Sequence, residues 1–253
     1  MIILNKEQVE KLKKQFRELR LPGMANTLIM LHETGELHTI SAGDLIVRLT
    51  EEELINRKNN TIERYLKRAK LSQPYASLEL IDYSPERKIN QAIMKQLSDD
   101  YYIQQHRNVI IMGACGTGKS YIANALASNA CRLGYTAYYC RMFEILEMTN
   151  SERLLTGDSQ NIIKKLIKPE VLVIDDLMNQ RLSEKECIDL FKILEYRTGC
   201  KTTIFASQLE PKEWHANLGG NILADSILDR ATASAYKLTL SGDSLRQKEK
   251  VSL

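Results

Sequence analysis

The sequence predicts an α/β fold in which helices flank a parallel sheet, preceded by a small all-α domain. Strand-like and helix-like segments alternate from residue 108 onward, which is typical of parallel sheets with helical crossovers. A glycine-rich segment at 113–120 joins one of these strands directly to a helix. The first 70 or so residues instead carry apolar residues at helical spacing. We therefore expect a helical domain over 1–72 and an α/β domain over 73–253, the latter with a short C-terminal lid.

Three helices are expected in the N-terminal domain. The first is predicted from apolar residues at helical spacing, namely Val9, Leu12, Phe16 and Leu19. The Leu-Pro-Gly segment at 21–23 breaks this helix, and a second one is expected over 24–35. Ser41 and Asp44 resemble a capping box, so a third helix is expected over 42–58.

An apolar stripe continues beyond the third helix, with basic residues largely opposite it. The stripe consists of Leu54, Ile55, Ile62, Tyr65, Leu66 and Ala69. The segment 57–70 holds six basic residues and one acid, while the whole chain has a formal net charge of only +3. This pattern predicts a surface that contacts DNA phosphates, although a solvated helix face would have the same composition. The predicted DNA contacts are Arg57, Lys58, Arg64, Lys67 and Arg68.

The composition excludes several classes of protein. A hydrophobic content of 43% with 26% charged residues indicates a globular rather than a disordered chain. No apolar run approaches the roughly 20 residues needed to span a bilayer, so we expect no membrane partner. Five cysteines without a C-x-x-C pair indicate buried, reduced thiols and a cytoplasmic protein.

The α/β domain begins with a connector at 73–88, after which predicted strands and helices alternate. The expected strands are 108–112, 136–140, 171–176, 201–207 and, after a helical segment from 212, a short run at 236–240. The expected helices between them are 121–134, 142–149 and 183–199.

The segment from Gly113 to Ser120 fits the P-loop pattern, and its position between a strand and a helix argues against a merely structural turn. Glycines let the backbone curl so that several N–H groups point at phosphates, and the helix N-terminus adds its dipole. Lys119 is expected to reach the β- and γ-phosphates, and the Ser120 hydroxyl to ligate Mg²⁺. The predicted ATP contacts are Gly113, Ala114, Cys115, Gly116, Thr117, Gly118, Lys119, Ser120 and Tyr121.

Acidic and polar residues end two further strands. Asp175 and Asp176 follow a buried strand; we expect Asp175 to act on the Mg²⁺ side and Asp176 to polarise an attacking water. A helix cap is the alternative for this pair. Ser207, or with less support Gln208, ends the next strand, where a polar side chain can lie beside the γ-phosphate.

The order of these motifs, continued by Leu-Asp-Arg230 and Ser-Gly-Asp-Ser-Leu-Arg246, resembles the AAA+ ATPases of the helicase-loader branch. The phrases FRELRLPGMANTL and RYLKRAKL are more similar to the IstB-like helpers of insertion-sequence transposition than to the replicative loader DnaC. The similarity covers the chain from about residue 6 to residue 246. It implies that Arg230 is a finger directed at a neighbouring subunit's γ-phosphate and that Arg246 is a second sensor on the lid. By spacing alone, both arginines would be ordinary surface residues.

The sequence departs from the family pattern at two places. Ala114 and Cys115 stand where relatives often have two prolines, and Asp176 stands where many AAA+ proteins have glutamate. The aspartate side chain is one methylene shorter than glutamate, which suggests slow ATP turnover.

The resemblance implies an ATP-dependent, self-assembling, double-stranded-DNA-binding ATPase that assists a transposase in target selection. Its expected cofactors are ATP and Mg²⁺, and its expected partners are duplex DNA, the cognate transposase and further copies of the chain. A replicative helicase loader, a small-molecule P-loop kinase and a scaffold that binds ATP without turnover are the alternatives.

Overall fold

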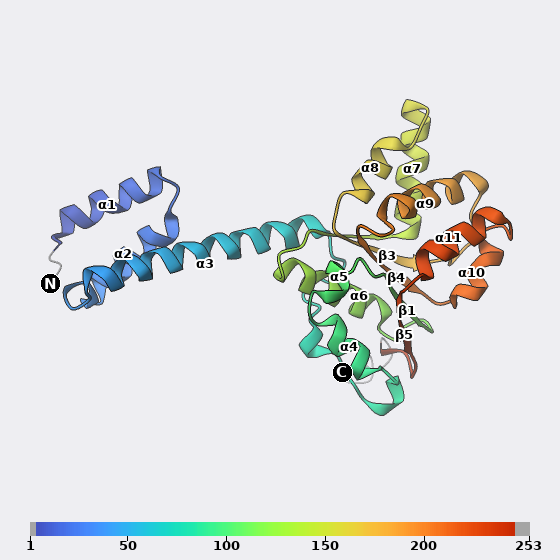
Figure 1. The fold of residues 1–253 in the computed structure, drawn as a ribbon, viewed down its shortest axis with the longest axis horizontal. Coiled ribbons are helices and arrows are strands. Elements are labelled where there is room, and N and C mark those ends of the chain that lie inside the picture. Colours follow the sequence, from blue (N-terminus) through green and yellow to red (C-terminus); the bar gives the residue numbers. More distant parts are fainter. Residues whose placement is uncertain (1–3, 246–253) are drawn as a thin grey trace, which may run out of the picture. The chain divides into compact units, whose positions relative to one another are not determined.

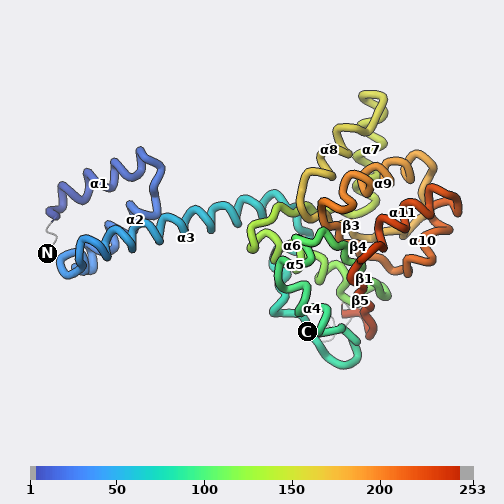
Figure 2. The backbone as a smooth tube through the Cα atoms, viewed as in Figure 1, coloured from blue at the N-terminus to red at the C-terminus, as the bar shows by residue number. Residues whose placement is uncertain are grey.

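The computed structural model describes residues 4–245 of the chain, which divides into two compact units between Arg64 and Tyr65. The first unit is helical, and the second contains a sheet with helices on both sides (Figure 1). Figure 2 traces the chain through both units. Within 4–245, no helix is long and apolar enough to cross a membrane.

The first unit packs three helices around a small apolar core. It contains α1 (Lys6–Glu18), α2 (Pro22–Glu33), the short 3-10 turn η1 (Glu36–His38) and most of α3 (Ala42–Ala69), which continues into the second unit. The buried core residues are Val9, Leu28, Leu31, Leu37 and Leu49. The predicted cap of α3 is confirmed, because the Asp44 N–H donates to the Ser41 hydroxyl at 3.1 Å.

The Pro-Gly pair at 22–23 opens α2, so the expected helix start at residue 24 was two residues late. Proline suits the first helical turn because the missing N–H has no intrahelical acceptor there. The Gly23 N–H donates to the carboxylate of Glu53 on α3 at 2.7 Å. A Cβ on Gly23 would lie 2.8 Å from the Glu53 Cα, so a glycine lets α2 and α3 approach this closely.

The second unit contains a five-stranded sheet in the order β2-β3-β4-β1-β5, with every neighbouring pair parallel. This confirms the predicted α/β class. The strands are β1 (Val109–Gly113), β2 (Ala137–Arg141), β3 (Val171–Leu177), β4 (Thr202–Ser207) and β5 (Tyr236–Leu240).

Two apolar cores cover the two faces of this sheet. The α6 helix (Lys119–Arg132) packs on one face, together with α4 (Gln91–Leu97) and α5 (Tyr101–Gln104). The other face is covered by α7 (Met142–Thr156), α8 (Gln160–Ile167), α9 (Glu184–Arg197), α10 (Pro211–Asn217) and α11 (Ile222–Thr232). Alternate residues of β1, β2, β3 and β4 therefore enter different cores, whereas the edge strand β5 contributes buried residues only to the core on the α6 side.

Several elements differ from the sequence-based expectation. The connector contains two 3-10 turns, η2 (Leu78–Leu80) and η3 (Pro85–Arg87), and α4, α5 and α8 were not predicted. These helices have at most eight residues, too few to show a clear period. The α7 helix runs past the expected residue 149 to Thr156 and is capped by Gly157, whose φ of 89° lies in the left-handed region.

The five cysteines are free thiols, but they are not all buried as expected. Cys131, Cys140 and Cys187 are buried, whereas Cys115 and Cys200 are exposed. Both exposed cysteines lie in turns, Cys115 after β1 and Cys200 after α9, so their exposure depends on loop position and not on residue type.

Candidate nucleotide-binding site

The carboxyl ends of four parallel strands meet at one edge of the sheet, where ligands bind in open α/β folds. The P-loop follows β1 there, and Arg141 ends β2. Arg141 is in register with Asp175 on β3, and Leu177 with Ser207 on β4. The sheet thus brings the predicted phosphate loop and the predicted acidic and polar residues to the same edge.

The P-loop backbone depends on its glycines. Gly116 and Gly118 have φ values of 81° and 90°, a region that is costly for residues with a Cβ. Gly118 precedes the first residue of α6, Lys119. The first N–H groups of that helix lack intrahelical partners and carry the positive end of the helix dipole, so they suit an anion.

The Ala114 carbonyl organises the inside of the loop. It accepts a hydrogen bond from the Thr117 hydroxyl at 2.8 Å and another from the Lys119 ammonium at 2.8 Å. The side chains of Ala114 and Cys115 are exposed. Because the loop uses the carbonyl of Ala114 and not its side chain, this departure from the family pattern leaves these bonds in place.

A cavity of about 350 Å³ lies beside the loop. Its volume falls in the range of small-molecule sites. It is lined by Gln73, Cys115, Gly116, Gly118, Lys119, Ser120, Tyr121, Asp176, Gln208 and Leu245. The loop, one of the two acids and one of the two candidate polar residues therefore surround a single space.

Asp175 is buried and already has hydrogen-bond partners. One carboxylate oxygen accepts from the Tyr139 hydroxyl at 2.6 Å, and the other from the Asp176 N–H at 2.9 Å. Burial, together with the negative charge of Asp175, raises the pKa of Tyr139 to about 12, so Tyr139 stays protonated and donates. Val171 and Val173 face the α6 side of the sheet, and strand alternation places Asp175 on that side too.

Asp176 has a different local structure. Between Ile174 and Leu177 the pairing of β3 with β4 contains one extra residue, which is a β-bulge. Asp176 has a φ of 54° in this bulge, a conformation in which aspartate is enriched. Its side chain is 40% exposed and lies 3.9 Å from the Arg141 guanidinium. The bulge thus turns Asp176 toward the cavity, whereas Asp175 remains buried.

The neighbours Ser207 and Gln208 also differ in position: Ser207 is buried, and Gln208 lines the cavity. The Ser207 hydroxyl donates to the Leu177 carbonyl at 2.8 Å and accepts from the Leu209 N–H at 3.1 Å. The expectation favoured Ser207, but the structure places Gln208 at the cavity and Ser207 in the interior.

Comparisons with known proteins agree with this geometry. A family model described as "IstB-like ATP binding protein" matches residues 14–252. The chain belongs to the IstB-like family.

Curated IstB-like relatives are similar over nearly the full length. Two insertion-sequence ATP-binding proteins of Sinorhizobium fredii are 32% identical over 231 residues and 34% identical over 232 residues. The alignments cover 91% of this chain and 92% or 93% of the relatives. An insertion-sequence ATP-binding protein of Geobacillus stearothermophilus is 25% identical, with 95% of each chain covered.

Solved structures share the fold of the second unit. DnaI matches with a TM-score of 0.56 at 19% identity, covering 67% of this chain and 90% of that one. The DnaC helicase loader matches with a TM-score of 0.54 at 18% identity, covering 70% and 99%. The fold is therefore that of P-loop AAA+ domains.

The finger arginine predicted for this IstB-like chain lies away from its own P-loop. Arg230 is near the end of α11, and its carbonyl accepts from Asn108, which precedes β1, at 2.9 Å. The P-loop follows the opposite end of that strand. The Arg230 guanidinium pairs with Glu195 and lies over the Phe191 ring, 4.6 Å from its centroid. Arg246 lies outside the described residues.

The five predicted DNA contacts are exposed residues of α3. Arg57, Lys58 and Arg64 belong to the first unit, and Lys67 and Arg68 to the second. Arg57 donates to the Glu53 carboxylate at 2.8 Å and to the Arg20 carbonyl at 3.2 Å. Arg57 therefore also ties α3 to the turn between α1 and α2.

The residues fit a magnesium ion that is held mainly by nucleotide phosphates. In the described part of the chain, no group of three His, Cys, Asp or Glu side chains could hold a metal ion. Mg²⁺ bound with nucleotides commonly takes one or two carboxylates, phosphate oxygens and water. Ser120 at the start of α6 and Asp175, on the α6 side of β3, are the residues that would supply such protein ligands.

Sequence reasoning missed three residues at this edge. Arg141 directly follows the predicted strand 136–140, so its place at the sheet edge was available from the same argument used for Asp175. Tyr139 and Gln73 gave no comparable signal, because their contacts with the site come from packing.

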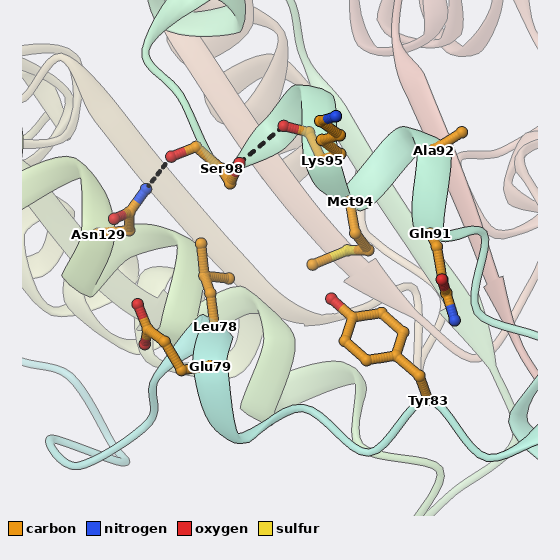
Figure 3. Close-up of a pocket in the computed structure, with 9 residues that line it drawn as sticks. All are labelled: Leu78, Glu79, Tyr83, Gln91, Ala92, Met94, Lys95, Ser98 and Asn129. Carbon is orange, nitrogen blue, oxygen red and sulfur yellow. Dashed lines mark hydrogen bonds between the residues drawn. The ribbon is translucent and has the colours of Figure 1, made fainter.

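A second cavity, of about 560 Å³, lies between η2, α4 and the end of α6. Figure 3 shows Leu78, Met94 and Tyr83 around it, with Asn129 donating to the Ser98 carbonyl at 2.9 Å at one end. It contains none of the P-loop residues or strand-end acids, so it is separate from the nucleotide cavity.

Proposed function

We propose that this IstB-like chain binds ATP with Mg²⁺ at the P-loop and uses it to assemble with further copies on double-stranded DNA. There it assists a transposase in selecting and engaging target DNA. The observation that carries the proposal is the family match over 14–252, which covers most of the helical unit and nearly all of the α/β unit. The curated relatives are insertion-sequence proteins.

In this proposal, the P-loop and Lys119 hold the phosphates, and Ser120 and Asp175 hold Mg²⁺. The bound ion neutralises phosphate charge. Asp176 lies in the cavity and accepts a proton from the attacking water, while Gln208 orients that water. Tyr139 fixes the Asp175 carboxylate through its 2.6 Å hydrogen bond.

We further propose that Arg230 completes the site of a neighbouring copy. Its position at the edge opposite its own P-loop supports action in trans. When an arginine of one subunit binds a phosphate held by another, nucleotide affinity and subunit affinity become coupled. Arg246 is proposed to contact nucleotide within its own subunit, as a second sensor.

The basic residues of α3 are proposed to contact DNA phosphates. Several weak phosphate contacts, repeated in an assembly, add up to firm binding with little sequence preference. Lys58, Arg64, Lys67 and Arg68 are exposed on this helix.

Electron microscopy with a long DNA duplex and a non-hydrolysable ATP analogue tests the proposal. We expect ordered assemblies on duplex DNA that require the nucleotide and are absent for Lys119→Ala. A single-stranded DNA of equal length is the matched control. Monomers under all conditions, or assembly on single strands alone, would contradict the proposal.

A further inference from the structure

A buried arginine in the connector contacts the outer side of the P-loop. Arg87 ends η3, thirty residues before Thr117 in sequence, and is 7% exposed. Its Nη2 donates to the Thr117 carbonyl at 2.8 Å, and its Nη1 to the Asp82 carbonyl at 3.2 Å. The guanidinium therefore bridges the connector and the loop.

The P-loop needs such partners because its amide groups are directed at phosphates. When the N–H groups of a curled loop converge on an anion, carbonyl groups point outward and require donors. The Thr117 carbonyl accepts a hydrogen bond from the Arg87 guanidinium, and the Gly116 carbonyl accepts one from the Leu245 N–H at 3.0 Å. A Cβ on Gly118 would lie 2.6 Å from Arg87 Nη2, so the guanidinium lies directly against the loop backbone.

The same arginine also holds the segment that follows β5. The Ser241 N–H donates to the Arg87 carbonyl at 3.0 Å. Gly242, with a φ of 94°, lies so close to η3 that a Cβ there would be 3.3 Å from the Glu86 carbonyl oxygen. Arg87 thus joins three segments: the connector, the P-loop and residues 241–245.

We propose that Arg87 is a positioning residue for nucleotide binding. Its guanidinium fixes the peptide group between Thr117 and Gly118, so that the loop amides converge on the α- and β-phosphates. Through Ser241 it also links the loop to the C-terminal segment, whose Leu245 lines the nucleotide cavity. The inference rests on the proposed ATP binding at the P-loop.

The test measures ATP and ADP affinity of the full chain by titration with fluorescent analogues. Because a hydrogen bond from a charged donor is removed, Arg87→Ala should weaken both nucleotides by about tenfold or more. Loop amides contact the phosphates that ATP and ADP share, so the two affinities should fall equally. A weakening confined to ATP would overturn the inference.

Chemical rescue separates positioning from a general loss of structure. Methylguanidinium at millimolar concentration should restore affinity to Arg87→Ala, whereas methylammonium should not. Failure of this rescue would count against the proposed role. Arg87→Lys covers the case in which the alanine variant does not fold: lysine keeps the charge but lacks the planar fork whose two nitrogens donate to the Asp82 and Thr117 carbonyls, so its affinity should fall by a smaller factor. An unchanged affinity for Arg87→Lys would overturn the inference.

Two further variants complete the design. Lys88→Asn removes the same charge from the next residue, which is exposed, and its left-handed φ of 50° suits asparagine; its ATP affinity should not change. A decrease as large as that of Arg87→Ala would mean that net charge alone explains the effect, and it would overturn the inference.

Lys119→Ala must lose ATP affinity if ATP binds at this loop. If Lys119→Ala binds ATP weakly but Arg87→Ala binds it normally, only the proposed role of Arg87 is rejected. If Lys119→Ala itself binds ATP normally, the nucleotide site is rejected.

Discussion

Asp176 combines an unusual backbone conformation with a chemically useful position. Its φ of 54° places it in a region where asparagine is tolerated as well as aspartate, so Asp176→Asn removes the charge with little backbone strain. We expect ATP affinity to persist and hydrolysis to fall by about 10²–10⁴-fold, the range for removal of a general base. Phosphate release and nucleotide titration measure the two effects. Unchanged hydrolysis would assign the water-activating role to another group.

The neighbours Ser207 and Gln208 provide a matched pair of substitutions. Ser207→Ala removes a buried hydroxyl that has both a donor and an acceptor partner. It should lower the free energy of unfolding by about 1–3 kcal/mol because the partner groups are left unsatisfied. Gln208→Ala should leave stability unchanged and slow ATP turnover. Thermal unfolding and phosphate release distinguish them, and the opposite assignment of effects would return the sensor role to Ser207.

Among the helices, the packing of α2 against α3 depends on one glycine. Gly23→Ala places a Cβ 2.8 Å from the Glu53 Cα, and such overpacking typically costs about 1–3 kcal/mol. Gly43→Ala is the control, because its Cβ would meet only the Ser41 hydroxyl at 3.8 Å. Alanine there should stabilise α3 by up to about 1 kcal/mol. Denaturant unfolding followed by circular dichroism measures both, and equal effects would contradict the close packing.

The basic face of α3 is expected to determine how strongly DNA binding depends on salt. Replacing Arg64, Lys67 and Arg68 with glutamate should weaken duplex binding and flatten its salt dependence, by about 0.9 in log–log slope for each DNA phosphate that is no longer neutralised. The same replacement of Lys6, Lys11 and Lys14 on α1, which are also exposed, controls for net charge. Binding measured at several salt concentrations gives the slope. Equal slopes for the two triple variants would assign the basic residues of α3 to the solvated surface.

For the molecule as a whole, assembly is proposed to depend on Arg230. Arg230→Ala should bind ATP normally, because its main chain lies at the sheet edge opposite the P-loop. It should fail to form nucleotide-dependent assemblies and should hydrolyse ATP slowly. Arg132→Ala, which removes an exposed arginine from the end of α6, is the control. Analytical ultracentrifugation with ATP measures assembly, and normal assembly by Arg230→Ala would place the finger elsewhere.

Features with local causes could be predicted from the amino-acid sequence. Alternating strand and helix patterns predicted the parallel sheet, and the glycines around Lys119 predicted the phosphate loop because their spacing is set by backbone geometry. The acidic pair at 175–176 was found because it ends a buried strand in a chain that also carries a P-loop pattern.

The directions of the side chains at that edge follow instead from tertiary packing. A one-residue bulge in β3 turns Asp176 into the cavity, and the pairing of β3 with β4 buries Ser207 while Gln208 lines the cavity. Arg87 reaches the P-loop across thirty residues of sequence. These features depend on register and packing between distant segments, which no local pattern in the sequence encodes.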